Sequence, residues 1–177
     1  KIAKKENVSV IFWRLRTADR EYPLFHVPQY FSILLDIFYH LGLTQTNYLM
    51  QLEETKKYLK QRFTKNKIEQ AEDIAKSVRG GDIILLASPK WHVTLLKLAK
   101  MHFNEIAMVP AHRNYIHEFR HSEVAICSKP IIKQSILIFQ DNREDEYTKK
   151  KIRNLIKILS EEKNKNIEII KIELNQE

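Results

Sequence analysis

The segment from His117 to His121, which reads HEFRH, carries side chains that could do chemistry. It fits the pattern H-E-x-x-H, in which residues i and i+4 lie on one face of a helix. Both imidazoles could then bind one zinc ion at about 2.0–2.1 Å, with the glutamate as general base. A metal-dependent hydrolase is therefore one hypothesis for this chain.

A catalytic zinc site needs a third protein ligand, and the sequence does not supply one in a familiar position. The metzincin continuation requires Gly at position 124 and His at position 127, where this chain has Val124 and Cys127. Glu144 and Glu146 lie farther downstream, but they open a segment expected to be a surface helix. Arg120 would also repel a divalent cation. We therefore expect no metal, and a simpler alternative is that these histidines occupy a loop or a helix end.

The composition is that of an ordinary globular protein, because 44% of the 177 residues are hydrophobic. Only 3 residues are glycine, and only Gly80 and Gly81 are adjacent. Glycines at these positions match neither the dinucleotide motif G-x-G-x-x-G nor the phosphate loop G-x-x-x-x-G-K-[ST]. The sequence thus excludes these two nucleotide-binding motifs.

The sequence carries no sign of secretion or membrane insertion. Its single cysteine, Cys127, has no partner for an internal disulfide, and no charged start leads into an apolar signal core. The most apolar stretch, Phe31 to Leu41, is interrupted by Asp36 and His40. We expect a cytoplasmic protein without a membrane partner.

The net charge of +8 favours phosphate-bearing partners, either nucleic acids or small sugar phosphates. The lysines are scattered, and the short clusters Lys4-Lys5 and Lys149 to Lys151 are not interleaved with aromatic residues. A solvated basic surface therefore explains the charge better than a nucleic-acid partner does.

The first part of the chain predicts a strand followed by helices. Val8 to Leu15 is a β-branched and aromatic run long enough for a buried strand, and Pro23 and Pro28 mark a connector. From Gln29 to Leu41 the apolar residues recur at spacings of three and four, which predicts a helix that ends at Gly42. Two further amphipathic helices are predicted over Thr44 to Phe63 and Asn66 to Arg79.

After Gly81 the pattern changes to alternating strands and helices. Asp82 to Ala87 is typical of a strand covered on both faces, and Ser88 and Pro89 resemble the N-cap and first residue of a helix. The later elements are expected to be a helix over His92 to His102, a short apolar piece over Ala107 to Ala111, a strand over Ser135 to Gln140, a helix over Asp145 to Glu162 and a strand over Ile167 to Ile172. This alternation predicts an α/β fold with three αβα layers and a parallel sheet of about five strands. We expect one domain over residues 1–177, with residues 1–79 as entry strand, connector and helical arm and residues 80–177 as the core.

A longer window, Lys97 to Ala125, resembles a known family in several elements that come in the same order. These elements are Asn104-Glu105 at the end of a helix, Pro110-Ala111 at a short strand, and the Glu-x-x-His sequence from Glu118 to His121. They resemble the C-terminal sugar isomerase (SIS) domain of the bifunctional phosphoglucose/phosphomannose isomerases, and Glu105 and His121 are 16 positions apart as in that family. The similarity extends more weakly from Val8 to Glu177.

The resemblance implies isomerisation of a hexose 6-phosphate through a cis-enediol, without a cofactor. It implies that Glu105 is the base acting at C1 and C2 and that His121 opens the sugar ring, with the histidine supplied across the interface of a homodimer. Asn104 either orients Glu105 or caps the helix. Glu118 either holds the His121 imidazole or pairs with an arginine, Arg113 or Arg120. Ser88 either binds the phosphate at a helix start or acts only as an N-cap.

The alternative within the same fold is a non-catalytic SIS module that binds phosphosugars or dimerises as a regulator. Met108 and Ser122 stand where the family usually has lysine and asparagine. The sequence also has no counterpart of the family's first SIS domain, which grips the sugar phosphate. We therefore expect a phosphosugar as ligand and a separate N-terminal SIS half as a further partner of this chain.

Overall fold

The structure is a computed structural model that describes residues 5–6, 10, 26–161 and 166–174. Its contacts divide the chain into two compact units, Lys1–Arg62 and Phe63–Glu177. The strand expected over Val8 to Leu15 lies outside the described residues except for Val10, which is not in a strand. The expectation of a single domain stays a prediction.

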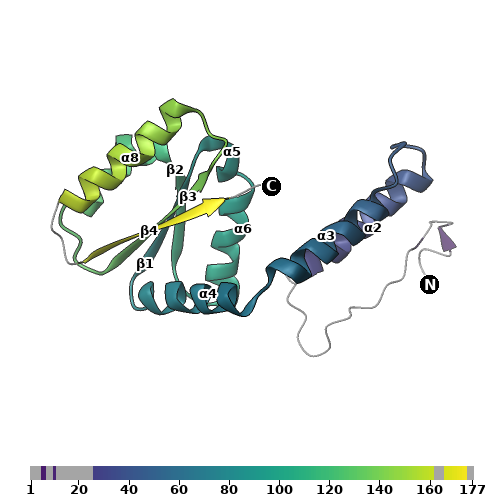
Figure 1. The fold of residues 1–177 in the computed structure, drawn as a ribbon, viewed down its shortest axis with the longest axis horizontal. Coiled ribbons are helices and arrows are strands. Elements are labelled where there is room, and N and C mark those ends of the chain that lie inside the picture. Colours follow the sequence, from purple (N-terminus) through teal and green to yellow (C-terminus); the bar gives the residue numbers. More distant parts are fainter. Residues whose placement is uncertain (1–4, 7–9, 11–25, 162–165, 175–177) are drawn as a thin grey trace. The chain divides into compact units, whose positions relative to one another are not determined.

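The first unit contains a helical hairpin, which confirms two of the predicted helices (Figure 1). Helix α2 (Val27–His40) has proline in its first turn, and the chain leaves it through Gly42 at φ 69°, a conformation that favours glycine. Helix α3 (Tyr48–Arg62) follows. None of the residues of the two helices is fully buried, and an apolar hollow between them is lined by Phe31, Leu35, Phe38, Thr44, Tyr48, Gln51, Leu52 and Thr55.

The second unit is built on a parallel sheet (Figure 1). Its strands are β1 (Asp82–Ala87), β2 (Ala111–Tyr115), β3 (Gln134–Asp141) and β4 (Ile167–Leu174). They lie in the order β2-β1-β3-β4, and every pairing is parallel. The described residues thus form four strands where about five were expected, and the parallel α/β prediction is confirmed.

Helices cover both faces of the sheet, because successive strand residues point to opposite sides. On one face, Ile83 and Leu85 pack with Leu96 of α6 (Leu95–Met101) and with Val78, which follows α4 (Lys65–Ser77). On the other face of the sheet lies a second hydrophobic cluster, which contains Ile84. Its cover consists of α7 (Ile116–Glu118), a π-helical turn (Phe119–Glu123), a 3-10 turn (Val124–Cys127) and α8 (Glu146–Glu161).

Two predicted elements differ from the structure. The helix expected over His92 to His102 is broken into α5 (Pro89–His92) and α6, because Thr94 departs from helical geometry at φ −101° and ψ −85°. The apolar piece expected over Ala107 to Ala111 is not a strand; β2 instead begins at Ala111. Met108 has φ 55°, and this left-handed residue turns the chain between the end of α6 and β2.

Among the described helices, none is both long enough and apolar enough to cross a membrane.

Candidate functional site

Asn104 and Glu105 lie on a π-helical turn, His102–Ile106, that continues α6. The backbone N–H of Ala111 donates a hydrogen bond of 2.9 Å to Asn104 Oδ1. This bond ties the end of the helix to the first residue of β2. The side-chain oxygen of Asn104 thus holds the start of β2.

Glu105 is an exposed side chain that forms no hydrogen bond or ion pair with the residues the structure describes. Next to it lies an open hollow of about 430 Å³, lined by Lys100, Asn104, Met108, Val109, Pro110, Ala111 and His112. The hollow is at the amino end of the sheet, the end where the parallel strands begin. In this single chain Glu105 is a solvated carboxylate beside an open surface.

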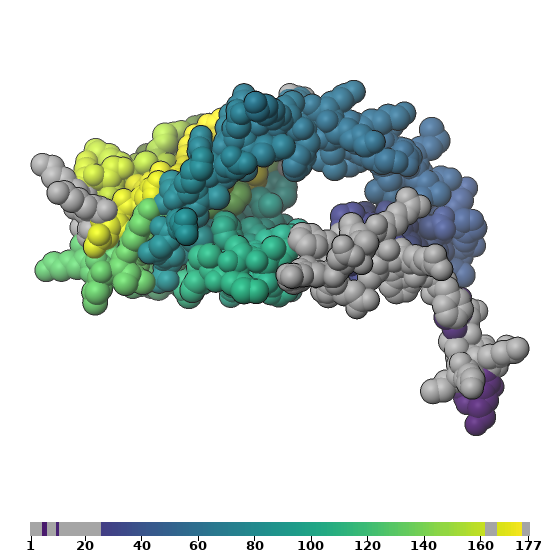
Figure 2. Space-filling model, turned by 90° about the horizontal axis from the view of Figure 1, so that it is seen from below, coloured from purple at the N-terminus to yellow at the C-terminus, as the bar shows by residue number. Residues whose placement is uncertain are grey.

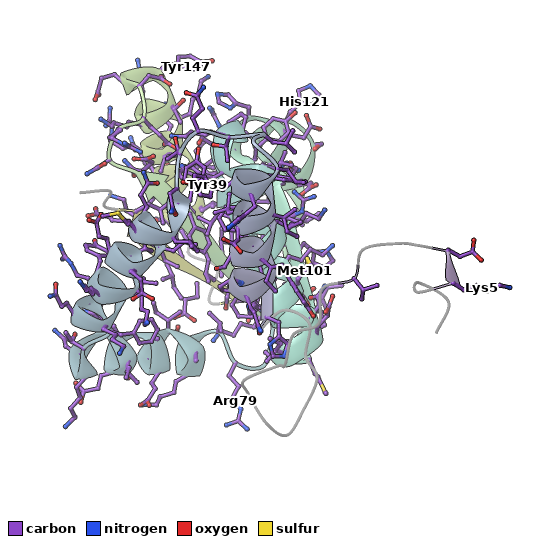
Figure 3. All side chains as sticks on the ribbon, turned by 90° about the vertical axis from the view of Figure 1, so that its right-hand side faces the viewer. Lys5, Tyr39, Arg79, Met101, His121 and Tyr147 are labelled. Atoms are coloured by element: carbon purple, nitrogen blue, oxygen red, sulfur yellow. The ribbon has the colours of Figure 1, made fainter. Side chains whose placement is uncertain are left out.

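His121 lies in the π-helical turn Phe119–Glu123 and is also exposed. The neighbouring Phe119 is fully buried in the cluster on the face opposite to α6. Figure 3 shows His121 well apart from Met101, the last residue of α6. The structure therefore places the two predicted catalytic residues on elements that cover opposite faces of the sheet and does not bring them together within one chain.

Glu118 contacts Ser122, one helical turn farther on. The Ser122 hydroxyl lies 3.0 Å from the Glu118 carbonyl oxygen and 3.1 Å from Glu118 Oε1. Within the described residues Glu118 forms neither a hydrogen bond with His121 nor an ion pair with an arginine. Its carboxylate is held by the serine that stands in place of the family's asparagine.

Ser88 follows β1 at the carboxyl end of the sheet and is 5% exposed. It occupies the N-cap position of α5, but its hydroxyl forms no capping bond and has no hydrogen-bond partner among the described residues. Both carboxylate oxygens of Glu144 are likewise buried without a partner. Burial raises the pKa of Glu144, and Ser88 lies close enough to oppose this shift without forming a well-aligned hydrogen bond.

The carboxylate of Asp141, whose charge also acts on Glu144, is 1% exposed but well paired. The Arg143 backbone N–H donates to Asp141 Oδ1 at 2.9 Å, which is the main cause of a lowered Asp141 pKa. The charges of Arg143 and Lys90 act in the same direction, and Lys90 Nζ is 3.5 Å from Asp141 Oδ2. The Ser88 hydroxyl therefore lies beside the buried carboxylate oxygens of Glu144, while the Asp141 carboxylate is paired with cations.

The histidine pair that matched the zinc pattern is not part of a metal-binding group in the described part of the chain. No cluster of three or more His, Cys, Asp or Glu side chains suited to a metal is present among the described residues. The His117 ring instead stacks on Tyr147 of α8, with ring centroids 5.8 Å apart. This contact packs the turn that carries His117 against α8.

One candidate residue that the sequence did not single out is Glu123, two positions after His121. Asn114 Nδ2 donates to Glu123 Oε1 at 2.8 Å, so a strand residue fixes this carboxylate. The contact joins β2 to the turn that carries His121. No short sequence motif predicts this contact, because the contact depends on how the turn packs on the sheet.

Comparison with known proteins identifies the family of this chain. No curated protein matches the chain significantly. A model of the family described as "Bacterial phospho-glucose isomerase C-terminal SIS domain" matches residues 67–177, which span α4 to the end of the chain. The match covers more than half of the sequence and the whole parallel sheet. The chain therefore belongs to the bacterial phosphoglucose isomerase C-terminal SIS domain family.

Proposed function

We propose that this domain serves the isomerisation of hexose 6-phosphates, converting glucose 6-phosphate or mannose 6-phosphate to fructose 6-phosphate. It would act as the C-terminal half of a phosphoglucose/phosphomannose isomerase. The observation that carries the proposal is the family match, which includes both Glu105 and His121. These residues stand on either side of β2 at the spacing of the family motif.

The proposed chemistry gives each residue its own proton-transfer role. The Glu105 carboxylate takes the proton from C2 of the open-chain aldose, the C–H electrons form the C1=C2 bond, and the C1=O π electrons move to O1, which gains a proton to give the enediol. The same carboxyl group then returns its proton to C1, whose new C–H bond takes the C1=C2 electrons, while the C2 hydroxyl loses its proton as the C2=O bond of the ketose forms. His121 opens the ring by giving a proton to the ring oxygen while the C1 hydroxyl loses one. A carboxylate and an imidazole both exchange protons efficiently near neutral pH when they are positioned against the substrate.

The position of the two residues supports a site shared between two copies of the chain. Glu105 and His121 belong to elements on opposite faces of one sheet, and both are exposed. A second copy could bring its His121 to the Glu105 side of the first copy. An N-terminal SIS half would then supply the phosphate anchor, since Ser88 lies beside the buried carboxylate oxygens of Glu144.

The test is the substitution Glu105→Gln in the complete isomerase that carries this domain. We expect the rate of fructose 6-phosphate formation to fall by about 10²- to 10⁴-fold, the usual contribution of a general base. Because Glu105 is exposed and unpaired with the described residues, the thermal unfolding midpoint should not change. Glu72→Gln, an exposed glutamate on α4, is the matched control and should keep full activity. An unchanged rate of fructose 6-phosphate formation in the Glu105 variant would contradict the proposal.

The non-catalytic SIS module is the second candidate, and the departures at Met108 and Ser122 favour it. Thermal unfolding with and without 5-phosphoarabinonate, an open-chain mimic of the enediolate, separates the two candidates. For a catalytic site, the ligand-induced rise of the unfolding midpoint should disappear in His121→Ala. A rise that survives the loss of both Glu105 and His121 would favour the regulator.

A further inference from the structure

A polar cleft lies at the amino end of the sheet, on the face covered by the turns of residues 119–127. Asp82 of β1 is paired in register with Gln134 of β3, and Ile84 with His112 of β2. Side chains two residues apart on a strand share a face, so Asp82, Gln134 and His112 point to the same side as the buried Ile84. The cleft has a volume of about 300 Å³ and is lined by Asp82, Ile84, Lys100, His112, Arg113, Glu123, Ile126 and Gln134.

Gln134 provides a buried acceptor that has no protein partner. The residue is 8% exposed, and its Oε1 atom forms no hydrogen bond with any described residue. An unsatisfied buried oxygen destabilises a folded protein, and proteins rarely keep one without a water or a ligand to fill it. Gln134 therefore favours a ligand that donates a hydrogen bond into this cleft.

Glu123 provides a second acceptor whose orientation is fixed in advance. Asn114, which is 8% exposed, donates from Nδ2 to Glu123 Oε1 at 2.8 Å, and its own Oδ1 accepts from the backbone of Tyr115 at 2.8 Å. The other oxygen of Glu123 has no partner among the described residues. Asp82 adds a further carboxylate that forms no ion pair with them. The cleft is thus rich in acceptors.

Lys100, on α6, and His112, on the edge strand β2, supply donors to the cleft. Both residues also line the hollow beside Asn104, so the cleft and that hollow meet at β2. Figure 2 looks toward this end of the second unit, with α4 in blue-teal and the end of α6 in teal-green. A ligand in the cleft would meet both these acceptors and the positive charge of Lys100.

We propose that this cleft is a second binding site, for a small polyhydroxylated molecule with one anionic group, the chemical class of the sugar phosphates. Its hydroxyl groups donate to Asp82, Glu123 and the Gln134 amide oxygen. Its anionic group faces Lys100. The inference rests on the residues that line the cleft and not on catalysis at Glu105, so the two proposals can fail separately.

The test measures equilibrium binding to the full chain by titration calorimetry at constant ionic strength. The probes are glucose 6-phosphate, glucose and inorganic phosphate. In the double variant Asp82→Asn with Glu123→Gln, which keeps side-chain volume and the Asn114 contact, glucose 6-phosphate should bind at least about tenfold more weakly, because hydrogen bonds to charged groups are lost. The control Glu72→Gln, an exposed glutamate on α4, should bind within about twofold of the natural chain.

Lys100→Met provides a variant outside the sheet in case the double variant does not fold. It should weaken glucose 6-phosphate binding while leaving glucose binding unchanged. Absence of binding of both sugars up to about 10 mM would overturn the proposal, since specific small-molecule sites bind more tightly. Equal binding by the double variant would overturn it as well. Loss of binding in Glu105→Gln would place the ligand at the catalytic carboxylate, and inorganic phosphate binding as tightly as glucose 6-phosphate would leave an anion site only.

Discussion

Two neighbouring carboxylates at the carboxyl end of the sheet show how partners decide the state of a buried acid. Asp141 accepts a backbone N–H and faces two cations, and its pKa is lowered. Glu144 is buried without a partner for either oxygen among the described residues, and its pKa is raised. The same edge of the sheet thus holds one carboxyl group whose pKa its partners lower and one whose pKa burial raises.

We predict that Glu144→Gln stabilises the protein at pH 8. The substitution removes a charge that burial disfavours, and the new amide can donate to the unpaired Ser88 hydroxyl. The expected gain in the free energy of unfolding is about 1 kcal/mol, the scale of one relieved polar group. Urea unfolding followed by circular dichroism measures it. Glu146→Gln, an exposed neighbour that pairs with Lys149, should instead be neutral or slightly destabilising.

The pH dependence of this gain follows from the direction of the Glu144 shift. Below the usual pKa of glutamate, folded and unfolded chains both hold the proton, and the carboxyl group imposes no charge penalty. As the pH rises from the usual pKa of glutamate to the raised folded-state pKa, the unfolded chain loses its proton while the folded chain keeps it. The free energy of unfolding therefore falls over this range. The advantage of the glutamine variant should therefore shrink as the pH is lowered toward 4. A gain that is constant with pH would contradict burial as the cause.

Met108 is a left-handed residue in the turn before β2, with φ 55°, and its side chain is 78% exposed. This conformation destabilises a residue other than glycine by about 1–2 kcal/mol, whereas glycine loses roughly 0.5–1 kcal/mol through the greater conformational entropy that it gives up on folding. We predict that Met108→Gly raises the unfolding free energy by about 0.5–1 kcal/mol. Thermal unfolding measures the change, and a lower midpoint would show that the turn is not strained.

At the scale of elements, the sequence predicts those segments whose apolar pattern is regular. The runs at Asp82 to Ala87 and Ser135 to Gln140 agree with β1 and β3, and the periodic segment from Asp145 agrees with α8. The pattern fails for β2, a strand that carries His112 and Arg113 and lies at the edge of the sheet. An edge strand tolerates polar residues, so its composition does not resemble that of a buried strand.

Gly81 marks a close approach of two backbones at the start of β1. A Cβ atom added there would overlap the backbone carbonyl of Lys133, just before β3. We predict that Gly81→Ala separates these strand ends and lowers the unfolding free energy by about 2 kcal/mol. At Gly80, with φ 86°, an added Cβ meets no atom, so Gly80→Ala should cost only the backbone strain, about 1 kcal/mol. Equal losses in the two variants, measured by urea unfolding, would contradict the close approach.

At the scale of the whole molecule, the sequence predicts the identity of the candidate site residues but not their arrangement. The spacing of Glu105 and His121 carries the family resemblance. Their separation arises because β2 joins the sheet between them, and the helical turns before and after β2 pack on opposite faces of that sheet. The contact of Asn114 with Glu123 depends likewise on tertiary packing. Spacing along the chain gives no information on either point.

The measurement that tests the account most directly mixes two inactive variants of the complete isomerase that carries this domain, Glu105→Gln and His121→Ala. If each site takes Glu105 from one copy and His121 from the other, a mixed dimer contains one intact site. Random exchange of subunits should then restore about a quarter of the natural rate of fructose 6-phosphate formation, because half of the dimers are mixed and each has one working site. A mixture as inactive as the separate variants, after proven exchange of subunits, would contradict the shared site.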